Sequence, residues 1–397
     1  MTVETLTGTL LNWASVLDEA TREQAITTSR LSFVYPHVAL MPDAHLGTGA
    51  TVGSVIPTDR ALVPAAVGVD LGCGMIAVRT QWTAEDLRRA GRLGELRESI
   101  ERRVPLSPGK YNRKIQRTAE PRLERLRERW DREVRARFGG DPEGYARHWE
   151  FQLGSLGGGN HFIEVVADEE DRVWAFLHSG SRGIGNKIAQ RHIRVARGVA
   201  ERYWIDLPHR DLAYLVEGTE EFERYVAELG WAQEFALLNR EEMMDRTLMA
   251  LARHLDEDLI EETRVNCHHN FTQKERHFGR DLWVSRKGAI EAREGQLGLI
   301  PGSMGTASYV VAGRGDPRAL SSAPHGAGRV LSRTAARKAY TVEDLRASMG
   351  GIEFRDSAAF VDEIPAAYKD IDTVMADAED LVRVVHRFRQ IVNVKGQ

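Results

Sequence analysis

Short apolar runs separated by glycine, proline and aspartate form the first clear pattern in the chain, between residues 34 and 78. Runs such as Gly53-Ser54-Val55-Ile56-Pro57 have the length of strands, and the turn-forming residues between them favour tight loops. Comparable runs return between Glu150 and His178 and again between Asn266 and Val311. The pattern predicts a β-rich core whose strands come from separated parts of the chain.

Two longer stretches carry apolar residues at helical spacing. The first covers residues 83–148, which are rich in Arg and Glu, and its apolar positions are Leu123, Leu126, Trp130, Val134 and Phe138. The second covers residues 220 to about 262, with a break expected at Gly230 because glycine weakens helices. A further helix is expected to begin near Gly185. We therefore predict an α+β fold, with a mixed β-rich core and helical insertions at about 83–148 and 220–262.

Composition indicates a globular protein and limits its electrostatics. The 397 residues are 42% hydrophobic and 28% charged, which is enough for a full core, and the net charge is −4. The global field therefore does not attract nucleic acid, and a surface that binds nucleic acid must be a local patch. Residues 102–117 carry six Arg or Lys residues and no acidic residue, which fits either a solvated loop or a patch for a phosphate backbone.

The two cysteines indicate a reducing compartment. Cys73 and Cys267 lie in segments rich in metal-ligand residue types and do not form a spaced disulfide framework. No basic and apolar leader opens the chain, and no run of about 18 apolar residues occurs, so neither secretion nor a membrane span is expected. These features predict a cytoplasmic protein.

Candidate chemistry is concentrated in histidine strings flanked by glycine or asparagine. Glycine lets the backbone come close to a ligand, and imidazole binds borderline metals through one nitrogen while the other orients the ring. Asp70 and Cys73 add a carboxylate and a thiol three residues apart among glycines, where a structural cysteine beside a turn-capping aspartate is the alternative. Several such strings favour a binuclear metal site. The histidine strings are Asn160-His161, Leu177-His178-Ser179-Gly180, His268-His269-Asn270 and His325-Gly326-Ala327-Gly328-Arg329.

The spacing of the histidines predicts how they meet. Alternating apolar residues between His161 and His178 predict a hairpin that brings both rings to one end of a sheet, either as metal ligands or as structural histidines. His268 and His269 are neighbours, so in an extended segment one ring faces the site and the other points away.

Two further glycine strings fit a nucleotide. Gly157-Gly158-Gly159 is an unusual choice for a plain strand, since glycine weakens strands, and close approach of a nucleotide explains it better. The string Pro301-Gly302-Ser303-Met304-Gly305-Thr306-Ala307-Ser308 offers backbone N–H groups and hydroxyls to a phosphate or a base. An ordinary glycine turn also fits this string, and it lacks the lysine of a Walker A loop.

His325 lies in the most open setting of these histidines. The glycines at 326 and 328 leave its ring accessible, and Arg329 can bind an anion with two parallel hydrogen bonds. A neutral imidazole in this position is a candidate nucleophile toward phosphorus, with a further metal ligand as the alternative. Lys395 is the last charged residue and lies where chain ends usually fray.

Six motifs in this order resemble those of the RtcB family of GTP-dependent RNA-splicing ligases, over residues from about Met41 to Gly396. They are Asp70-Leu71-Gly72-Cys73-Gly74, Gly158-Gly159-Asn160-His161, His178-Ser179-Gly180-Ser181-Arg182-Gly183, Asn266-Cys267-His268-His269-Asn270, Pro301-Gly302-Ser303-Met304-Gly305 and His325-Gly326-Ala327-Gly328-Arg329. The resemblance implies an RtcB-like fold, with a single catalytic domain over residues 1–397. It also implies an enzyme that joins an RNA 3′-phosphate or 2′,3′-cyclic phosphate end to a 5′-hydroxyl end.

The same resemblance implies two Mn²⁺ ions per active site and GTP as co-substrate. The implied metal ligands are Asp70, Cys73, His161, His178 and His269, with the cysteine bridging the two metals. His325 is implied to attack the α-phosphate of GTP and to form a guanylate adduct, from which GMP passes to the RNA 3′-phosphate before the 5′-hydroxyl displaces it. The implied contacts to the guanine nucleotide are Asn160, Glu164, Pro301, Gly302, Ser303, Met304, Ser308, Gly326, Ala327, Gly328 and Lys395.

Contacts to the RNA end or its phosphates are implied for Asp43, Arg182 and Arg329. The loop His45-Leu46-Gly47-Thr48-Gly49 departs from the family pattern, because Thr48 stands where many relatives are expected to have a lysine. This difference bears on RNA-end affinity and on substrate range. An accessory activator protein is a further candidate partner, and no membrane is expected as one.

Three alternative activities share parts of this residue set. A metal-dependent cyclic phosphodiesterase would not require His325 or Lys395, and a non-catalytic RNA-end-binding protein would show damage at the ligand positions, which the sequence does not. An enzyme that caps a 3′-phosphate with GMP without sealing uses the same first two chemical steps as a ligase. The sequence therefore does not separate capping from ligation.

Overall fold

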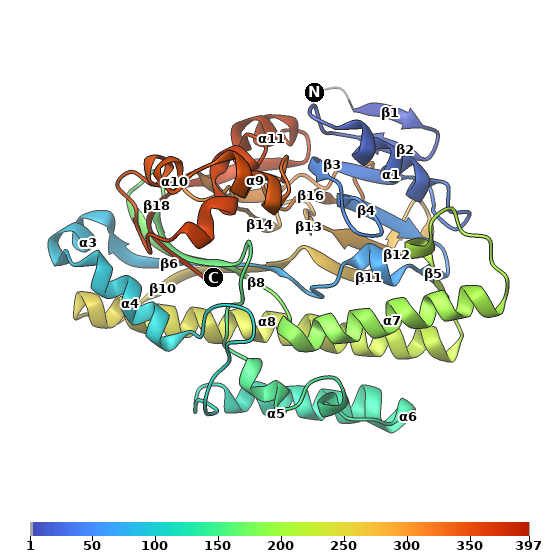
Figure 1. Cartoon of the computed structure of the whole chain (residues 1–397), viewed down its shortest axis with the longest axis horizontal. Helices are drawn as coiled ribbons and strands as arrows, with labels where there is room; N and C mark the ends of the chain where they lie inside the picture. Colours follow the sequence, from blue (N-terminus) through green and yellow to red (C-terminus); the bar gives the residue numbers. More distant parts are fainter. Residues whose placement is uncertain (1–2, 397) are drawn as a thin grey trace.

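The computed structural model describes residues 3–396 and confirms a mixed α+β fold built on two sheets (Figure 1). The larger sheet has the order β10 (Glu261–His268), β6 (Gly74–Thr83), β8 (Arg172–Ser179), β7 (Phe162–Ala167), β18 (Val382–Lys395), β15 (Ser308–Gly313) and β14 (Leu297–Ile300). The short strand β17 (Glu353–Phe354) pairs in parallel with the last part of β18. All other neighbours in this sheet are antiparallel.

The second sheet gathers the N-terminal strands and one later hairpin. Its order is β1 (Glu4–Thr7), β2 (Leu10–Asn12), β3 (Val38–His45), β4 (Val52–Thr58), β12 (Arg280–Lys287) and β11 (Asn270–His277). Two small pairs complete the strands, β5 (Ala61–Leu62) with β9 (Leu215–Val216) and β13 (Ala289–Glu291) with β16 (Ser322–Pro324). Because β11 follows β10 after one residue, the two sheets are joined at His269.

Helices surround the sheets, and the two longest run beneath them in Figure 1. The α-helices are α1 (Glu19–Ser29), α2 (Pro64–Val67), α3 (Ala84–Ala90), α4 (Leu93–Arg103), α5 (Glu120–Trp130), α6 (Ala136–Phe138), α7 (Arg182–Arg202), α8 (Glu220–Leu255), α9 (Arg333–Ala339), α10 (Val342–Ser348) and α11 (Ile371–Asp377). A π-helical turn over Asp131–Arg135 links α5 to α6, and short 3₁₀ helices cover Pro142–Gly144, Trp149–Gln152, Arg210–Leu212, Ala358–Glu363 and Pro365–Ala367. Among residues 3–396, no helix has the length and apolar character that a membrane span needs.

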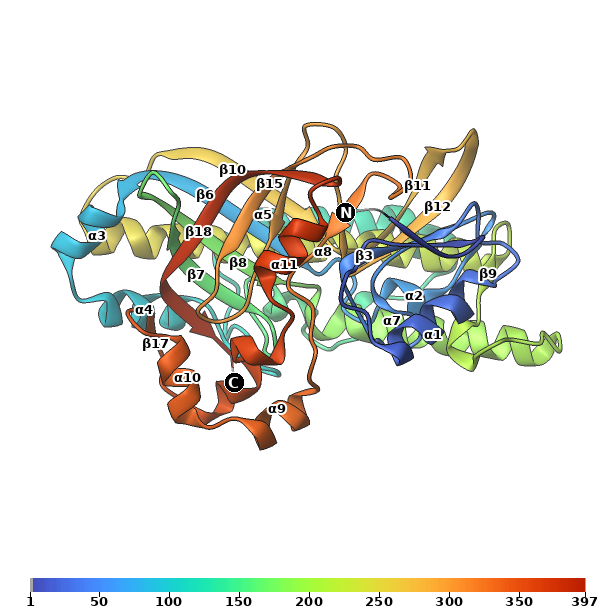
Figure 2. The same ribbon diagram turned by 90° about the horizontal axis from the view of Figure 1, so that it is seen from above.

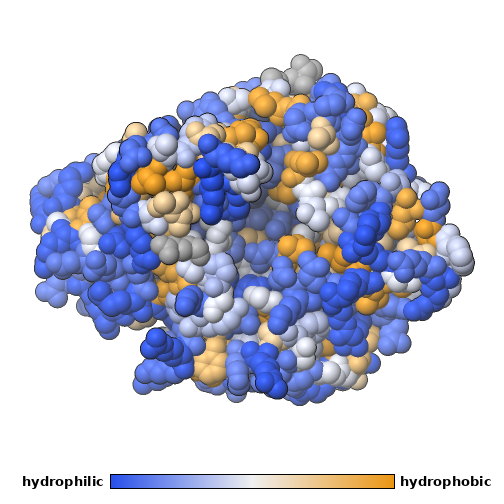
Figure 3. All heavy atoms as spheres, in the orientation of Figure 1, coloured by the Kyte–Doolittle hydropathy of each residue, from blue (hydrophilic) through white to orange (hydrophobic). Residues whose placement is uncertain are grey.

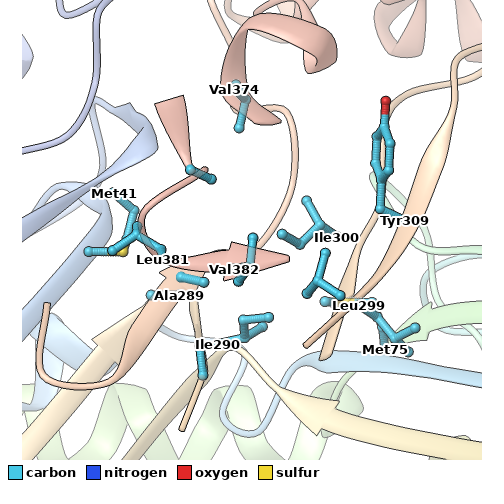
Figure 4. Packing of buried hydrophobic residues seen from close by; sticks show 14 of the residues in the cluster. Met41, Met75, Ala289, Ile290, Leu299, Ile300, Tyr309, Val374, Leu381 and Val382 are labelled. Atoms are coloured by element: carbon cyan, nitrogen blue, oxygen red, sulfur yellow. The ribbon is translucent and has the colours of Figure 1, made fainter. Parts of the chain in front are cut away.

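The larger sheet is buried on both faces, which explains the nearly continuous apolar sequence of its strands. Met75 and Ala77 of β6 pack into one core cluster, whereas the alternate residues Ile76 and Val78 pack into another. The first cluster joins the sheets, and Figure 4 shows Met75 there with residues of β13, β14 and β18. The second cluster lies between the sheet and helices α3, α4 and α8.

The helical segments differ from the sequence expectation in one respect. Helix α8 runs without a break through Gly230 and ends at Leu255, so the expected break is wrong, and residues 261 and 262 already belong to β10. The glycine provides space and does not interrupt the helix, since a Cβ there would lie 2.8 Å from Arg129 Nη2. In residues 83–148, helices α3 to α6 are present, and the loop 104–119 separates α4 from α5.

Tertiary packing stabilises α8 where it meets α5. Trp231 is fully buried, its indole N–H donates to Leu126 O at 2.8 Å, and its ring packs edge-on against Trp130 and Trp149. This packing keeps α8 continuous through Gly230, because the burial of large aromatic rings stabilises the helix by more than one glycine destabilises it.

We predict that Trp231→Ala lowers the free energy of unfolding by about 3–5 kcal/mol, because it opens a cavity between α5 and α8 and leaves Leu126 O without its donor. Urea denaturation followed by circular dichroism measures the change. Trp204→Ala is the matched control, since Trp204 is 94% exposed, and it is expected to change stability by about 0.5 kcal/mol or less. Equal losses in the two variants would contradict this account of the packing.

Candidate active site

The antiparallel register of the larger sheet brings the predicted metal ligands to one edge. Cys73 directly precedes β6, His178 lies near the end of β8, His161 directly precedes β7, and His269 directly follows β10. Gly74 pairs with both His268 and Ser179, and Phe162 pairs with His178. In antiparallel neighbours the start of one strand meets the end of the next, so all four side chains reach the same place. The predicted hairpin of β7 and β8 is confirmed.

The ligand atoms of this cluster lie within contact of one another. Cys73 Sγ is 3.4 Å from His161 Nε2 and 3.3 Å from His178 Nε2. His178 Nε2 lies 2.8 Å from His269 Nε2, and Asp70 Oδ2 lies 3.2 Å from His161 Nε2. The five residues that the sequence predicted as ligands therefore converge on one point.

The donor set fits borderline divalent metals, because it combines a thiol, imidazoles and one carboxylate. Cys73, His161 and His178 are buried and offer ligand atoms that lie within 4.8 Å of one another. Burial lowers the pKa of His178 and of His269 well below the ordinary histidine value, and neighbouring histidines lower it further. These rings are therefore neutral, and their lone pairs face a shared space that a cation can fill.

The thiol and the carboxylate respond to this environment in opposite directions. Burial and then the charge of Asp70 raise the pKa of the Cys73 thiol. Burial alone would raise the pKa of Asp70 as well, but the hydrogen bond and charge of His161 and the charge of Arg182 hold it below its ordinary value. A divalent cation would displace the thiol proton, as metals do from coordinating thiols.

Backbone contacts orient the rings toward the cluster. His161 Nδ1 lies 2.9 Å from Leu156 O, and His178 Nδ1 lies 3.2 Å from Asn160 O. A carbonyl accepts from Nδ1–H, so each ring presents its Nε2 lone pair to the cluster. Asp70 receives a hydrogen bond from Ser181 N at 3.0 Å, and a Cβ at Gly180 would lie 2.2 Å from Asp70 Oδ1. The glycine is required there by this close approach.

His268 and His269 point to opposite sides, as the sequence predicted. His269 faces the cluster, whereas His268 Nδ1 lies 2.8 Å from Gly72 O. Arg240 of α8, a fully buried residue that the sequence analysis missed, donates to Gly72 O at 2.8 Å and to Ser179 O at 3.2 Å. It fixes the turn that carries Asp70 and Cys73, and no motif in the sequence around it signals this role.

His325 follows β16 and is held by Asp43 of β3. Asp43 Oδ2 accepts from His325 Nδ1 at 2.6 Å and from the backbone N–H groups of His325 and Gly326 at 3.0 and 3.1 Å. The Asp43 side chain is fully buried and contacts His325, so its contact to the RNA end or its phosphates stays a prediction. A carboxylate at Nδ1 selects the tautomer that carries its proton there, which leaves the Nε2 lone pair available.

Gly328 is needed to bring these segments together. Its φ is +75°, and a Cβ at this residue would lie 2.3 Å from Asp43 O. The His325 ring lies beside the metal-ligand cluster, with its centroid 4.6 Å from that of His269. A nucleophile candidate and a metal-site candidate thus share one location.

Both open onto a cavity of about 360 Å³ (Figure 3 shows the hollow in the middle of this face). Its lining includes most of the predicted nucleotide contacts, namely Asn160, Glu164, Pro301, Gly302, Ser303, Met304, Gly326, Ala327, Gly328 and Lys395. Ser308 lies behind the 301–304 loop, where its Oγ accepts from Gly302 N at 3.2 Å. The Ser308 side chain therefore contacts the 301–304 loop and stabilises the conformation of that loop.

One end of the cavity presents unpaired acceptors. Glu164 is buried and accepts from Asn393 Nδ2 at 2.8 Å, but Glu164 Oε2 and Asn393 Oδ1 have no partner among residues 3–396. Burial raises the pKa of Glu164 to about 8, although the charge of Lys395 opposes this. Two buried acceptors side by side fit a ligand that donates two hydrogen bonds.

Lys395 is ordered and buried, because β18 extends to this residue and pairs it with Phe162. Its ammonium lies 3.0 Å from Glu363 Oε2. Arg329 binds the same carboxylate at 3.3 Å, donates to Tyr368 O–H at 2.8 Å and stacks on the Tyr368 ring. The guanidinium of Arg329 is thus tied largely to the protein itself.

Arg182 explains part of the triple glycine that the sequence assigned to a nucleotide. A Cβ at Gly157 would lie 2.1 Å from Arg182 Nη1 and 2.8 Å from His161 Nδ1. The close neighbour of Gly157 is therefore protein, and the nucleotide interpretation is wrong at that residue. Arg182 also donates from Nε to Ser155 Oγ at 3.1 Å.

Lys287 of β12 lies in the cavity at the position of the unusual Thr48. Its buried ammonium donates to Thr48 O and, at 3.1 Å, to Ala65 O. Burial lowers the pKa of Lys287 to about 7. An amine is thus present beside Thr48, supplied by a strand more than 200 residues later, and nothing in its sequence context signalled this.

The whole chain is similar to known RNA-splicing ligases. The family model described as tRNA-splicing ligase RtcB matches residues 24–396. The RNA-splicing ligase RtcB of Escherichia coli strain K12 is 47% identical over 387 residues, which cover 94% of each chain. The tRNA-splicing ligase RtcB of Pyrobaculum aerophilum is 32% identical over 445 residues, which cover 95% of this chain and 91% of the relative. Since these matches include every segment of the cavity described above, the chain belongs to the RtcB ligase family.

Proposed function

We propose that this protein is a GTP-dependent RNA ligase that joins an RNA 3′-phosphate or 2′,3′-cyclic phosphate end to a 5′-hydroxyl end through a guanylylated His325. The proposal depends above all on the contact of His325 Nδ1 with Asp43 Oδ2 at 2.6 Å, beside a cluster of buried metal-ligand atoms. A nucleophilic nitrogen and a cation site at one cavity are what nucleotidyl transfer requires. The names of the relatives support RNA as the substrate.

The metal ligands proposed for two Mn²⁺ ions are Asp70, Cys73, His161, His178 and His269. Cys73 would hold the ions together with these histidines, since its Sγ lies 3.4 Å from His161 Nε2 and 3.3 Å from His178 Nε2. When bound, the ions supply positive charge that neutralises the phosphates and polarises the attacked phosphorus. The protein's contribution is to hold the donors in neutral or anionic form at one edge of the sheet.

In the first step, His325 Nε2 forms a bond to the α-phosphorus of GTP and pyrophosphate leaves with the electrons of the broken P–O bond. Asp43 keeps the Nδ1 proton in place and stabilises the positive charge that the ring acquires. An oxygen of the RNA 3′-phosphate then attacks the phosphorus of the adduct, and the N–P bond breaks. A 2′,3′-cyclic phosphate is first opened by water to the 3′-phosphate.

In the last step, the RNA 5′-hydroxyl oxygen attacks the 3′-phosphorus and GMP leaves, so that a phosphodiester joins the two strands. The guanine base is proposed to lie at Glu164 and Asn393, whose free oxygens accept from the donors on its edge. Backbone N–H groups of the 301–304 loop and the side chain of Asn160 line the path to the phosphates. Lys395 stands at the base end of the cavity, where its charge favours the ionised form of Glu164.

His325→Ala is expected to abolish the covalent GMP adduct, because no other side chain offers a free Nε2 oriented by a carboxylate at this place in the cavity formed by residues 3–396. The measurement is incubation with radiolabelled GTP and Mn²⁺, a denaturing gel and a test of acid lability. Bound metal should stay at the wild-type level, and loss of metal would place His325 among the ligands. His386→Ala is the control, since that ring pairs with Glu169.

Cys73→Ala is expected to lower both bound metal and adduct formation, because it removes the ligand that contacts two histidines. Metal content is measured by inductively coupled plasma mass spectrometry after dialysis. Cys267→Ala removes the other free cysteine and should keep full metal content. A fully metallated and active Cys73→Ala protein would rule out Cys73 as a metal ligand.

GMP affinity is expected to rise with pH through about 8. The pKa of Glu164 is raised to about 8, so the carboxyl is neutral at lower pH, and both of its oxygens become acceptors, one for Asn393 and one for a guanine donor, only when it ionises. Between pH 6.5 and 8.5 the gain should be roughly 25-fold, since the ionised fraction of a group with a pKa of about 8 rises from about 3% to about 76% over this range. Equilibrium dialysis with radiolabelled GMP measures it, and Glu164→Gln should flatten the profile. An unchanged profile in that variant would assign the titration to a group other than Glu164.

A further inference from the structure

A series of cations without ion-pair partners extends from the active site across one face of the molecule. We call it the basic track, and its members are Lys110, Arg113, Lys114 and Arg117 of the loop between α4 and α5, with Lys187, Arg191 and Arg194 of α7. Arg191 is half-buried and the other six side chains are exposed. Within the part of the chain that the structure describes, none of the seven has a carboxylate within 4.0 Å.

The lack of carboxylates is unusual for this chain. Most exposed arginines elsewhere are paired with nearby acids, as Arg88 is with Glu85, Arg135 with Asp131 and Arg276 with Asp281. The whole chain carries more acidic than basic residues, with a net charge of −4. A solvated surface of average composition would therefore show such pairs, and the basic track concentrates positive charge locally instead.

The loop part of the track lies next to the metal-ligand cluster. Ser107 N donates to Gly157 O at 2.8 Å, and Gly157 contacts the metal-ligand candidate His161. The Arg182 guanidinium, near the cluster, lies 5.9 Å from the centre of the Tyr111 ring. In Figure 1 this loop lies beside the C-terminus and the first turn of α7. The loop that carries the cations is thus attached to the protein beside the metal-ligand cluster.

The loop is fixed to the protein and does not project freely. Asn112 Nδ2 donates to Phe151 O at 2.9 Å and to Leu153 O at 2.7 Å, and Asn112 Oδ1 accepts from Arg246. Tyr111, directly before this anchor, is 36% exposed. An exposed aromatic ring between basic residues at the rim of a cavity provides a flat surface on which a base can stack.

The helical part continues from the same end. Helix α7 begins at Arg182, and Lys187, Arg191 and Arg194 follow at spacings of four and three residues, which places them on one side of the helix. Together with Gly144, Tyr145 and Gln190 they line a surface groove. Figure 3 shows the surface below the hollow, where α5 and α7 lie, as mostly hydrophilic.

We propose that the basic track binds the phosphate backbone of a single-stranded RNA end, and that Tyr111 stacks on a base of that strand as it enters the cavity. The inference rests on the proposed RNA ligase function and names the surface that would hold its substrate. Phosphates bind unpaired Lys and Arg side chains, while an aromatic ring contacts any base through its π-face. Single strands expose both groups at once, whereas a duplex hides its base faces.

The test compares three double variants that remove the same charge. Arg113→Gln/Lys114→Gln changes the loop, Lys187→Gln/Arg194→Gln changes the helix, and Arg30→Gln/Arg383→Gln changes two exposed arginines at the end of α1 and the start of β18. Fluorescence anisotropy measures the Kd of a labelled single-stranded RNA with a 3′-phosphate at several salt concentrations, without GTP. Each track variant should reduce the slope of log K against log salt by about 1.4, at about 0.7 per lost phosphate contact. The control variant should keep the wild-type slope.

Tyr111 is tested separately. Tyr111→Ala should weaken binding of the same RNA by roughly 5- to 100-fold, whereas Tyr111→Phe should bind as wild type, since stacking needs the ring and not the hydroxyl. The salt slope should stay the same in both, because neither substitution changes a charge. Equal binding by Tyr111→Ala, or equal affinity of the protein for a blunt RNA duplex, would overturn the stacking contact.

Adduct formation distinguishes a failure of the track from a failure of the proposed function. Labelling of His325 by GTP without RNA should be the same in wild type and in all track variants. If wild type forms the adduct but the track variants keep its RNA affinity and salt slope, the basic track is wrong and the ligase proposal stands. If wild type forms no adduct, the proposed function fails first, and a retained salt effect would leave an RNA-binding surface on a protein of another activity.

Discussion

The antiparallel register of the larger sheet is the constraint on which the site depends. Five neighbouring strands bring the start of one and the end of the next to the same edge, and they carry Cys73, His161, His178, His269 and Lys395 there. A shift of one residue in any pairing would turn the ligand side chain to the other face of the sheet. Burial of both faces in separate apolar clusters opposes such a shift. Core packing thus determines the positions of the ligand atoms.

The candidate nucleophile His325 depends on a second constraint, the docking of the two sheets. Asp43 belongs to β3 of the smaller sheet, while His325 follows β16, which packs against β3. The hydrogen bond between the two side chains connects these elements. The apolar cluster in Figure 4 includes Met41 near Asp43 and Met75 near Cys73. The same packed core therefore supports the metal ligands and the oriented histidine, and the relative position of the two is as rigid as the core.

Sequence patterns predicted those parts of the site that local rules govern. The hairpin of His161 and His178 and the opposed rings of His268 and His269 follow from the period of two in strands, and the structure has both. Arg240, Lys287 and the contact of Asp43 with His325 were missed because they depend on contacts across the fold, at separations that no local pattern encodes. The triple glycine shows the same limit, since its close neighbour at Gly157 is an arginine from another element. The expected break at Gly230 was wrong because aromatic burial outweighs the helix propensity of one residue.

The cations inside the cavity are already paired with acceptors of the protein itself. Lys395 and Arg329 share the carboxylate of Glu363, and Lys287 is held by backbone carbonyls. These cations therefore have limited capacity to neutralise a triphosphate and an RNA terminus together. On the proposed function, the remaining positive charge would come from metal ions held by the neutral imidazoles and the thiol, and from the exposed cations outside the cavity. The buried ion pairs at the edge of the sheet shape the cavity. The unpaired cations that we propose to bind RNA lie on other elements, the loop between α4 and α5 and helix α7.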